Sequence, residues 1–368
     1  MLRLRSLASL AALLLVLPAC DSSEPDPDGP LAEAQANLGQ WTFIDVEGSQ
    51  CRDGSPTGIG VRLQDGADDL VIYLEGGGAC FNSVTCATNS PSFSEADFAR
   101  KVTAVGDAGL FSTATSNPVG DYNMVYVPYC TGDVHAGSSA NNSLLQAAGV
   151  PGTQQFVGHG NVERALALLA DGLDTPDKVL LAGSSAGGLG VLFNFGATAE
   201  TFPASDLFMV DDSGPVVYAD DVLSPQLVAQ IVGLYNASAA LPEAPELFER
   251  DAFPGIYNYY AETYPDARFG FSSYLGDNVF QGFFGFGQLD EITDDEFAAG
   301  LRDLRARISP NWATYYAEGN DHTFLLKPDR YDGTSAGVVY SDWLAGLLSG
   351  SLRNVDPGVA ARGPLAAR

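Results

Sequence analysis

Short apolar runs separated by glycine-rich or polar loops dominate the chain from about residue 38 onward. Four runs have the length and composition of buried strands: residues 69–74, 123–128, 178–182 and 206–210. Longer segments with a helical period lie between such runs. Strands that alternate with helices predict the α/β class, with a mostly parallel central sheet flanked by helices.

The helical period is clearest between the second and third of these runs. Apolar residues recur there at i, i+3, i+4 and i+7, at Val162, Ala165, Leu166 and Leu169. This spacing gives a helix one apolar face that can lie on the sheet. Residues 223–268 are rich in Tyr, Phe, Pro and acidic side chains, and we interpret them as a helical cap over the edge of the sheet.

A single catalytic domain accounts for most of the 368 residues, because α/β domains of this size form around one sheet and 46% of the residues are apolar. We place this domain at residues 38–350. It follows a signal peptide at residues 1–19 and an acidic tether rich in Pro, Asp and Ser at residues 20–37. Residues 351–368 form a C-terminal tail with little apolar period.

The N-terminus has the pattern of an export signal. Arg3 and Arg5 precede an apolar run at residues 7–17, which is too short to span a bilayer as a permanent anchor. The run ends in Leu-Pro-Ala-Cys, which resembles a bacterial lipobox with Cys20 as the lipidated residue. The sequence therefore predicts an exported protein, tethered to the cell envelope through Cys20 or, if the cysteine is incidental, released outside the cell.

The charge balance excludes one class of partner. The chain has 18 Lys and Arg against 46 Asp and Glu, a net charge of −28, and a field of this sign repels nucleic acid. Only three His residues are present and no Cys-x-x-Cys pair occurs, so the sequence predicts no metal and no cofactor. The oligomeric state is not determined by these patterns.

Four cysteines remain when Cys20 is set aside. In an exported chain they favour two disulfides, for which three pairings are possible. Their spacing favours Cys80 with Cys86, which leaves Cys51 with Cys130.

Residues 183–187 read Gly-Ser-Ser-Ala-Gly and directly follow a predicted strand. This Gly-x-Ser-x-Gly pattern builds the nucleophile elbow of α/β-hydrolases, where a serine lies in a strained turn between strand and helix. Such a match arises easily by chance in a chain with 41 glycines, but the strand before it supports the assignment. Ser185 is the predicted nucleophile, since Ser184 occupies the variable position of the motif.

A serine nucleophile needs a base and an orienting acid, which follow it in the order acid, then His, in this fold. Among His135, His159 and His322, only His322 lies after the serine. Three carboxylates are candidates for the acid. Residues 268–276 alternate like a strand and deliver Asp277 at their end, and Asp212, after an earlier strand, is the alternative; Asp321 is adjacent to His322 and cannot easily reach its ring.

Acyl transfer also needs backbone N–H donors for the developing oxyanion. The strand at residues 71–74 breaks into Glu75 followed by three glycines, comparable to the glycine loops of lipases. We predict that Gly77 and Gly78 supply donors and that Ala186, the residue after the nucleophile, supplies another. The alternative is a glycine turn held by a Cys80–Cys86 disulfide.

Five motifs in order resemble the pectin acetylesterase and Notum family. They are residues 51–56 (CRDGSP), 74–80 (LEGGGAC), 129–137 (YCTGDVHAG), 183–188 (GSSAGG) and 212–214 (DSG). Ala79 and His135 stand where the family usually has Trp. Residues 277–281 are similar to the family's Asp-x-x-Gln motif with one extra residue, which implies that Asp277 is the acid, and the resemblance also supports pairing Cys51 with Cys130.

The resemblance implies hydrolysis of a carboxylic ester. We expect acetylated polysaccharide or a small acyl ester as the substrate, with a pectin-type carbohydrate O-acetylesterase as the first hypothesis. A lipid or general carboxylesterase is the alternative, because the loss of both Trp residues would widen the acyl pocket. A non-catalytic binding protein on the same scaffold is the third hypothesis, since a fold alone never proves activity.

Overall fold

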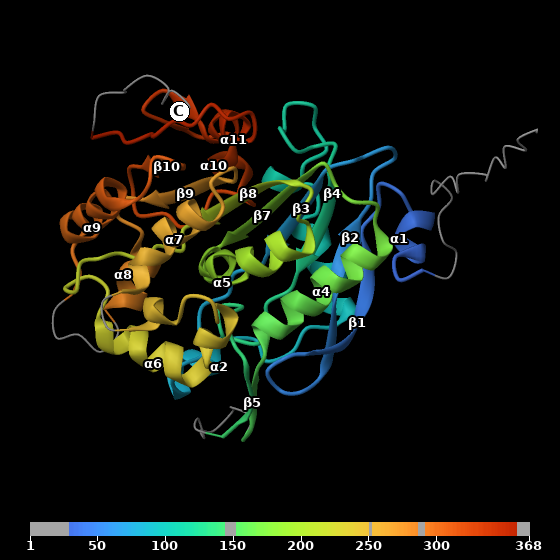
Figure 1. Ribbon diagram of the computed structural model, residues 1–368, viewed down its shortest axis with the longest axis horizontal. Helices are drawn as coiled ribbons and strands as arrows, with labels where there is room; N and C mark the ends of the chain where they lie inside the picture. Colours follow the sequence, from blue (N-terminus) through green and yellow to red (C-terminus); the bar gives the residue numbers. More distant parts are fainter. Residues whose placement is uncertain (1–28, 144–151, 250–251, 286–290, 359–368) are drawn as a thin grey trace, which may run out of the picture.

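The computed structural model describes residues 29–143, 152–249, 252–285 and 291–358. Its centre is an eight-stranded sheet in the order β1-β2-β4-β3-β7-β8-β9-β10 (Figure 1). The strands are β1 (Thr42–Gln50), β2 (Pro56–Arg62), β3 (Leu70–Leu74), β4 (Asn123–Val127), β7 (Lys178–Ser184), β8 (Asp206–Asp212), β9 (Arg268–Tyr274) and β10 (Trp312–Ala317).

The sheet is mostly parallel. Strands β4, β3, β7, β8, β9 and β10 run in one direction, whereas β2 is antiparallel to both β1 and β4. The four strands predicted from their apolar runs are β3, β4, β7 and β8, and the alternating segment before Asp277 is β9. The predicted α/β class is therefore confirmed.

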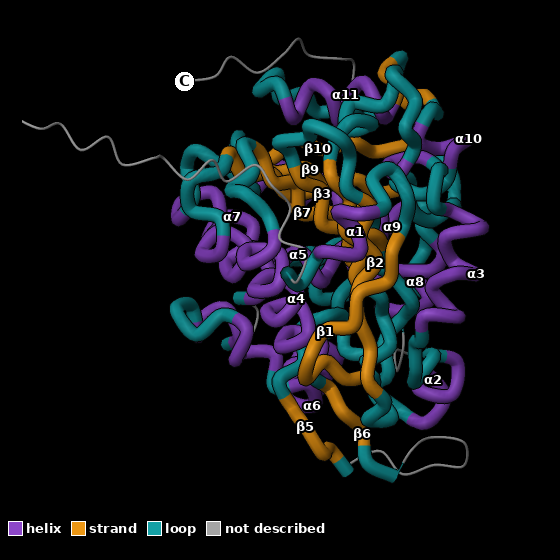
Figure 2. Tube along the Cα trace, turned by 90° about the vertical axis from the view of Figure 1, so that its right-hand side faces the viewer, coloured by secondary structure: helices purple, strands orange, loops and turns teal. Residues whose placement is uncertain are grey.

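Helices cover both faces of the sheet. Helices α4 (Gly158–Gly172), α5 (Ala186–Thr201), α7 (Ile256–Thr263) and α9 (Asp294–Arg307) contribute to the apolar core on one face; α3 (Glu95–Val105) and α11 (Tyr340–Leu348) contribute to the core on the other. Figure 2 shows the strands between α4, α5 and α7 on one side and α3 and α10 (Pro328–Tyr331) on the other. Because both faces are covered, all five residues of the central strand β3 are buried.

The apolar face predicted for the helix before β7 is the buried face of α4. Its four residues, Val162, Ala165, Leu166 and Leu169, are at most 1% exposed. They pack toward the sheet in the same core as residues of α5, the helix that follows the predicted nucleophile.

Residues 223–268 are helical, but only part of this segment lies near the predicted site. It contains α6 (Pro225–Tyr235), α7 and three short 3₁₀ helices, η2 (Ala237–Ala240), η3 (Pro245–Phe248) and η4 (Phe253–Gly255). Helix α7 belongs to the core, because Tyr257 and Tyr260 are fully buried. Helix α6 instead touches the loop after the three consecutive glycines, where Gln230 Nε2 donates to the Phe81 carbonyl at 3.1 Å.

Both ends of the described chain pack more closely than the sequence suggests. Helix α1 (Ala32–Ala36) lies within the predicted tether, and Leu31 and Ala34 are completely buried. At the other end, Val355 pairs with β10 through hydrogen bonds to Thr314 and Tyr316. Two small clusters of contacts therefore dock these segments, although neither segment is long enough to show an apolar period.

The predicted signal peptide and Cys20 lie outside the described residues, as does the end of the C-terminal tail. In the part of the chain that the structure describes, no helix has the length and apolarity needed to cross a membrane.

The remaining elements are short. They are α2 (Ser83–Thr88), α8 (Asn278–Phe284), η1 (Gly109–Phe111), and the strand pairs β5 (Ser139–Asn142) with β6 (Gln154–Phe156) and β11 (Thr334–Ser335) with β12 (Val338–Val339).

Candidate active site

The predicted site residues gather at the carboxyl ends of four neighbouring strands. Ser185 follows β7, Asp212 ends β8, Asp277 follows β9, and His322 follows β10. Since these strands are parallel and adjacent in the order β7-β8-β9-β10, their ends meet at one edge of the sheet. This is the edge where open α/β sheets place their ligands.

Ser185 occupies a strained turn between β7 and α5. Its φ of 60° and ψ of −118° are unusual for a residue with a side chain. Strand and helix approach so closely here that a Cβ at Gly183 would lie 2.2 Å from the Gly187 carbonyl oxygen, and a Cβ at Gly187 would lie 2.0 Å from that of Leu74. The two glycines of the motif are therefore required by packing.

Ser184 faces the interior. It is 6% exposed, and its hydroxyl donates to Asp212 Oδ2 at 2.7 Å. Ser185 instead lines a cavity that opens at the surface. The two adjacent serines thus lie in different surroundings, and only Ser185 faces a space that a substrate can enter.

His322 and Asp277 are hydrogen bonded to one another. The His322 Nδ1–H donates to Asp277 Oδ2 at 2.7 Å, because a carboxylate can only accept. The other ring nitrogen, Nε2, is buried and has no hydrogen-bond partner among the described residues. Phe280 lines the same cavity as Ser185, and the centroid of its ring lies 5.8 Å from that of the imidazole.

Asp277 is completely buried and also begins α8. Its Oδ1 accepts hydrogen bonds from the N–H groups of Val279 and Phe280, at 3.0 and 3.1 Å. One carboxylate oxygen therefore caps a helix while the other faces the histidine. The cap fixes the carboxylate, and through it the plane of the imidazole.

Asp212, the alternative acid, binds the backbone after His322 and not its ring. Asp212 Oδ2 accepts from the N–H groups of Phe324 and Leu325, at 2.9 and 3.0 Å. Burial raises the pKa of this carboxyl, while these backbone donors and Ser184 act in the opposite direction. Asp212 thus anchors the loop that carries His322.

Arg330 braces the same loop from its other side, which sequence reasoning missed. Its guanidinium donates to the backbone carbonyls of His322 and Thr323 and to Asp321 Oδ1. Asp321 is bound here on the surface, away from the imidazole. Nothing in the local sequence pattern of the α10 region indicates this contact.

The glycine loop after β3 is held through its carbonyl groups. Asn89 Nδ2 donates to the Gly77 carbonyl at 2.7 Å, and the Tyr129 hydroxyl donates to the Gly78 carbonyl at 2.9 Å. The loop also lies against the nucleophile turn, because a Cβ at Gly76 would be 3.0 Å from the Ser185 Cβ. Ala186 is the first residue of α5, so its N–H has no acceptor within the helix.

The other two histidines, His135 and His159, make hydrogen bonds inside the fold. His135 is 2% exposed, its Nε2 donates to the Glu75 carbonyl at 2.9 Å, and burial lowers its pKa to about 4. His159 Nδ1 donates to Asn194 Oδ1 at 2.8 Å. His135 is therefore neutral near pH 7 and supports the start of the glycine loop.

The cavity beside Ser185 is small. Its volume is about 40 Å³, enough for a few water-sized groups. Ala79 lines it, whereas His135 does not, so only one of the two replaced Trp positions faces this space. Its walls are Gly78, Ala79, Val134, Ser185, Ala186, Leu189, Val279, Phe280 and Phe283.

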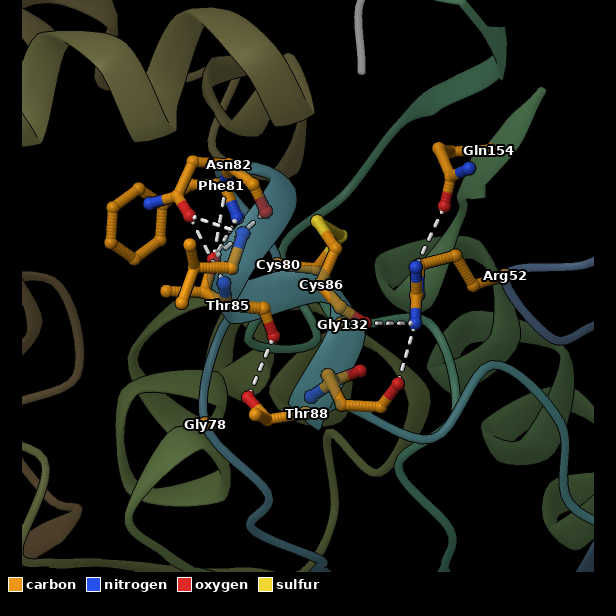
Figure 3. The surroundings of a disulfide bond; sticks show 12 residues. Arg52, Gly78, Cys80, Phe81, Asn82, Thr85, Cys86, Thr88, Gly132 and Gln154 are labelled. Carbon is orange, nitrogen blue, oxygen red and sulfur yellow. Dashed lines mark hydrogen bonds between the residues drawn. A yellow bond between two sulfur atoms is a disulfide. The ribbon is translucent and has the colours of Figure 1, made fainter. Parts of the chain in front are cut away.

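Both expected disulfides are present, Cys51–Cys130 and Cys80–Cys86. The second joins two cysteines six positions apart, directly after the glycine loop. Figure 3 shows this loop beside Arg52, whose guanidinium donates to the Cys86 carbonyl at 3.0 Å and to Gln154 Oε1 at 2.8 Å.

Comparisons with known proteins agree with this architecture. The chain is 35% identical over 175 residues to human palmitoleoyl-protein carboxylesterase Notum, covering 45% of this chain and 34% of the human protein. It is 34% identical over 162 residues to notum1a of Danio rerio, covering 43% of this chain and 31% of that protein. The matched region is thus about a third of each relative's length.

A solved structure shows the same fold over a longer stretch. The Wnt deacylase Notum from Drosophila superposes with a TM-score of 0.63 at 19% identity, over 87% of this chain and 97% of that chain. A model of the pectinacetylesterase family matches residues 32–249, more than half of the chain. The protein therefore belongs to the pectinacetylesterase family.

Proposed function

We propose that this protein is an exported serine esterase that removes acetyl groups from carbohydrate. The observation that carries the proposal is the arrangement around His322. Its Nδ1 is bound to the buried Asp277, its Nε2 is unpaired, and Ser185 lies in a strained turn at the same sheet edge. This is the set of groups that nucleophilic acyl transfer requires.

The proposed reaction uses these groups in turn. Ser185 Oγ attacks the acetyl carbonyl carbon while His322 Nε2 takes the hydroxyl proton, and Asp277 stabilises the imidazolium that forms. The N–H groups of Gly77, Gly78 and Ala186 are the proposed donors to the oxyanion. His322 then protonates the departing sugar oxygen, and a water activated by His322 releases acetate from Ser185.

The size of the cavity favours a short acyl group. A volume of about 40 Å³ supports an acetyl methyl group over an extended fatty-acyl chain. The curated relatives named above are palmitoleoyl-protein carboxylesterases, which supports the competing hypothesis of a lipid esterase. Acyl length is therefore the property that separates the two hypotheses.

The deciding experiment compares acyl chains on one leaving group. We expect kcat/KM to be highest for p-nitrophenyl acetate and to fall through butyrate to octanoate, with acetate released from acetylated xylan or pectin. Preference for octanoate, or for a palmitoleoylated peptide, would assign the lipid esterase function. No turnover of any ester by folded protein would instead indicate a non-catalytic binding protein.

The charge of the protein provides a test of the polysaccharide. At a net charge of −28, the chain repels a polyanion such as pectin, and this repulsion is screened by salt. Added salt should therefore increase the rate on acetylated pectin more than the rate on acetylated xylan, which carries less charge.

The proposed location rests on the two disulfides and the N-terminal pattern. Disulfides persist mainly outside the cytoplasm. Lipidation of Cys20, which lies outside the described residues, would anchor the enzyme to the membrane surface. Palmitate labelling of the wild type, with loss of the label in Cys20→Ala, tests the anchor.

A further inference from the structure

Side chains hold the glycine loop on the side opposite to its proposed oxyanion donors. The carbonyls of Glu75, Gly77 and Gly78 each accept a hydrogen bond, from His135, Asn89 and Tyr129 respectively. In a trans peptide the C=O and the following N–H point in opposite directions. The bond from Asn89 to the Gly77 carbonyl therefore also fixes the direction of the Gly78 N–H.

Asn89 is itself held rigidly. It is 5% exposed, and the Arg52 guanidinium donates to its backbone carbonyl at 2.6 Å and to that of Cys86 at 3.0 Å. Arg52 is 1% exposed and is fixed at its other nitrogen by Gln154 (Figure 3). The Cys80–Cys86 disulfide closes the segment that lies between Arg52 and the glycine loop.

The surroundings of the Asn89 amide leave it little freedom. Its Oδ1 is buried without a hydrogen-bond partner in the described part of the chain, so the Gly77 carbonyl is the polar group that the amide serves. The backbone of Gly132 packs against it, because a Cβ there would lie only 2.8 Å from Asn89 Oδ1. A buried amide with one unsatisfied atom costs stability, which is difficult to explain by folding alone.

We propose that Asn89 is a positioning residue for the oxyanion hole, a role that rests on the proposed esterase function. The three consecutive glycines allow their peptides to rotate, and Gly78 already adopts a φ of +79°. With Asn89 in place, the Gly78 N–H points into the site before the substrate carbonyl gains charge. Without it, the peptide must be reoriented during the reaction, and this cost falls on the transition state.

The test uses two substitutions at Asn89 and one matched control. Asn89→Ala removes the donor, and Asn89→Asp keeps the size but replaces the donor by an acceptor. Loss of a direct oxyanion donor lowers kcat by ~100- to 1000-fold, so we expect about a 10- to 100-fold fall in kcat for these indirect changes, with little change in KM. Asn82→Ala is the control, because Asn82 caps α2 in the same disulfide loop without touching the glycine loop.

A transition-state analogue separates positioning from general damage. A trifluoromethyl ketone that forms a tetrahedral adduct with Ser185 should lose affinity for both Asn89 variants by the same factor as kcat/KM. The pH profile of kcat/KM should not move, since His322 and Asp277 are not touched. Rates are expressed per site titrated with a fluorophosphonate, so that unfolded protein does not count.

The outcomes are distinct. Wild-type kcat per titrated site in Asn89→Asp, or equal losses in Asn82→Ala, would overturn the positioning role; if Asn89→Ala does not fold, Asn89→Asp decides alone. A loss of kcat without a matching loss of ketone affinity would overturn it as well. A wild-type protein that hydrolyses no ester would overturn the proposed function itself.

Discussion

Replacing Asp277 by Asn should abolish most turnover for a reason that the capping geometry makes specific. Asp277 Oδ1 accepts from two backbone N–H groups, those of Val279 and Phe280, while Oδ2 accepts from His322 Nδ1. If the NH₂ group of the Asn side chain faced these two backbone N–H groups, donors would face a donor and no hydrogen bond could form. The oxygen of Asn must therefore stay on the helix side, and its NH₂ group must face His322.

The consequence is the wrong tautomer of the histidine. An NH₂ group facing Nδ1 is satisfied only when Nδ1 is unprotonated, so the imidazole proton moves to Nε2, the atom that must accept the proton of Ser185. Loss of the correct tautomer lowers kcat by ~10⁴ in a Ser-His-Asp triad. Because a fraction of the protein keeps the correct tautomer, we expect kcat to fall by about three to four orders of magnitude, which is roughly 4 to 5.5 kcal/mol of activation free energy.

The assay is hydrolysis of p-nitrophenyl acetate by purified Asp277→Asn, with KM expected to remain near the wild-type value. Asp212→Asn is the matched control, because Asp212 is equally buried at the end of the neighbouring strand but binds Phe324 and Leu325. The serine hydroxyls beside Asp212 can rotate to accept from an amide, so this variant should lose stability more than activity. An inactive Asp212→Asn combined with an active Asp277→Asn would refute the assignment of the acid.

Four further substitutions test other parts of the protein. Ser185→Ala should abolish hydrolysis and fluorophosphonate labelling, whereas Ser184→Ala should stay active and lose only about 1 kcal/mol of stability with its hydrogen bond; labelling of Ser184 would contradict this. Phe283→Ala should enlarge the proposed acyl cavity and raise kcat/KM for longer acyl groups, relative to acetate, by about fourfold per added methylene, because burying one methylene contributes ~0.8 kcal/mol. An unchanged acyl profile would show that Phe283 does not line the acyl site. Burial raises the pKa of Asp133 to about 6, so the folded state favours the protonated carboxyl. This contribution to stability is present below about pH 4 and is lost as pH rises to about 6. The difference in Tm between pH 4.5 and pH 7 should be smaller in Asp133→Asn than in the wild type, and an equal difference would refute the linkage.

The sequence predicts which candidate residues lie at one sheet edge where their positions follow from chain order and strand ends. Ser185 follows a recognisable strand and lies in a known motif, and His322 is the histidine that comes after it. The prediction of Asp277 as the acid also needed the family resemblance, because the strand pattern alone left Asp212 as an alternative. The structure separates the two carboxylates by their partners, a ring nitrogen for Asp277 and backbone N–H groups for Asp212.

The supporting residues could not be predicted in this way. Arg52 is 102 residues from Gln154 and 37 from Asn89, and no local period relates these positions. Each of these side chains is polar and buried, whereas composition assigns polar residues to the surface. Their positions depend on the complete tertiary structure, and so does the packing of single apolar residues such as Leu31 and Val355 at the ends of the domain.

Helix α8 contributes more of the wall of the cavity beside Ser185 than the two positions where the family usually has Trp. His135 does not line the cavity, since its ring lies against Tyr129, with centroids 4.8 Å apart, and donates to the Glu75 carbonyl. Ala79 does line the cavity, as do Val279, Phe280 and Phe283 of α8.

Asp277 is the N-cap of α8, so one residue links His322 to the wall of the cavity beside Ser185. The carboxylate that orients His322 also caps the helix that carries Phe280 and Phe283. A shift of this first turn would change the imidazole geometry and the acyl cavity together. Among substitutions in α8, those that leave its N-terminal cap in place can therefore change the cavity beside Ser185 without changing the hydrogen bond to His322.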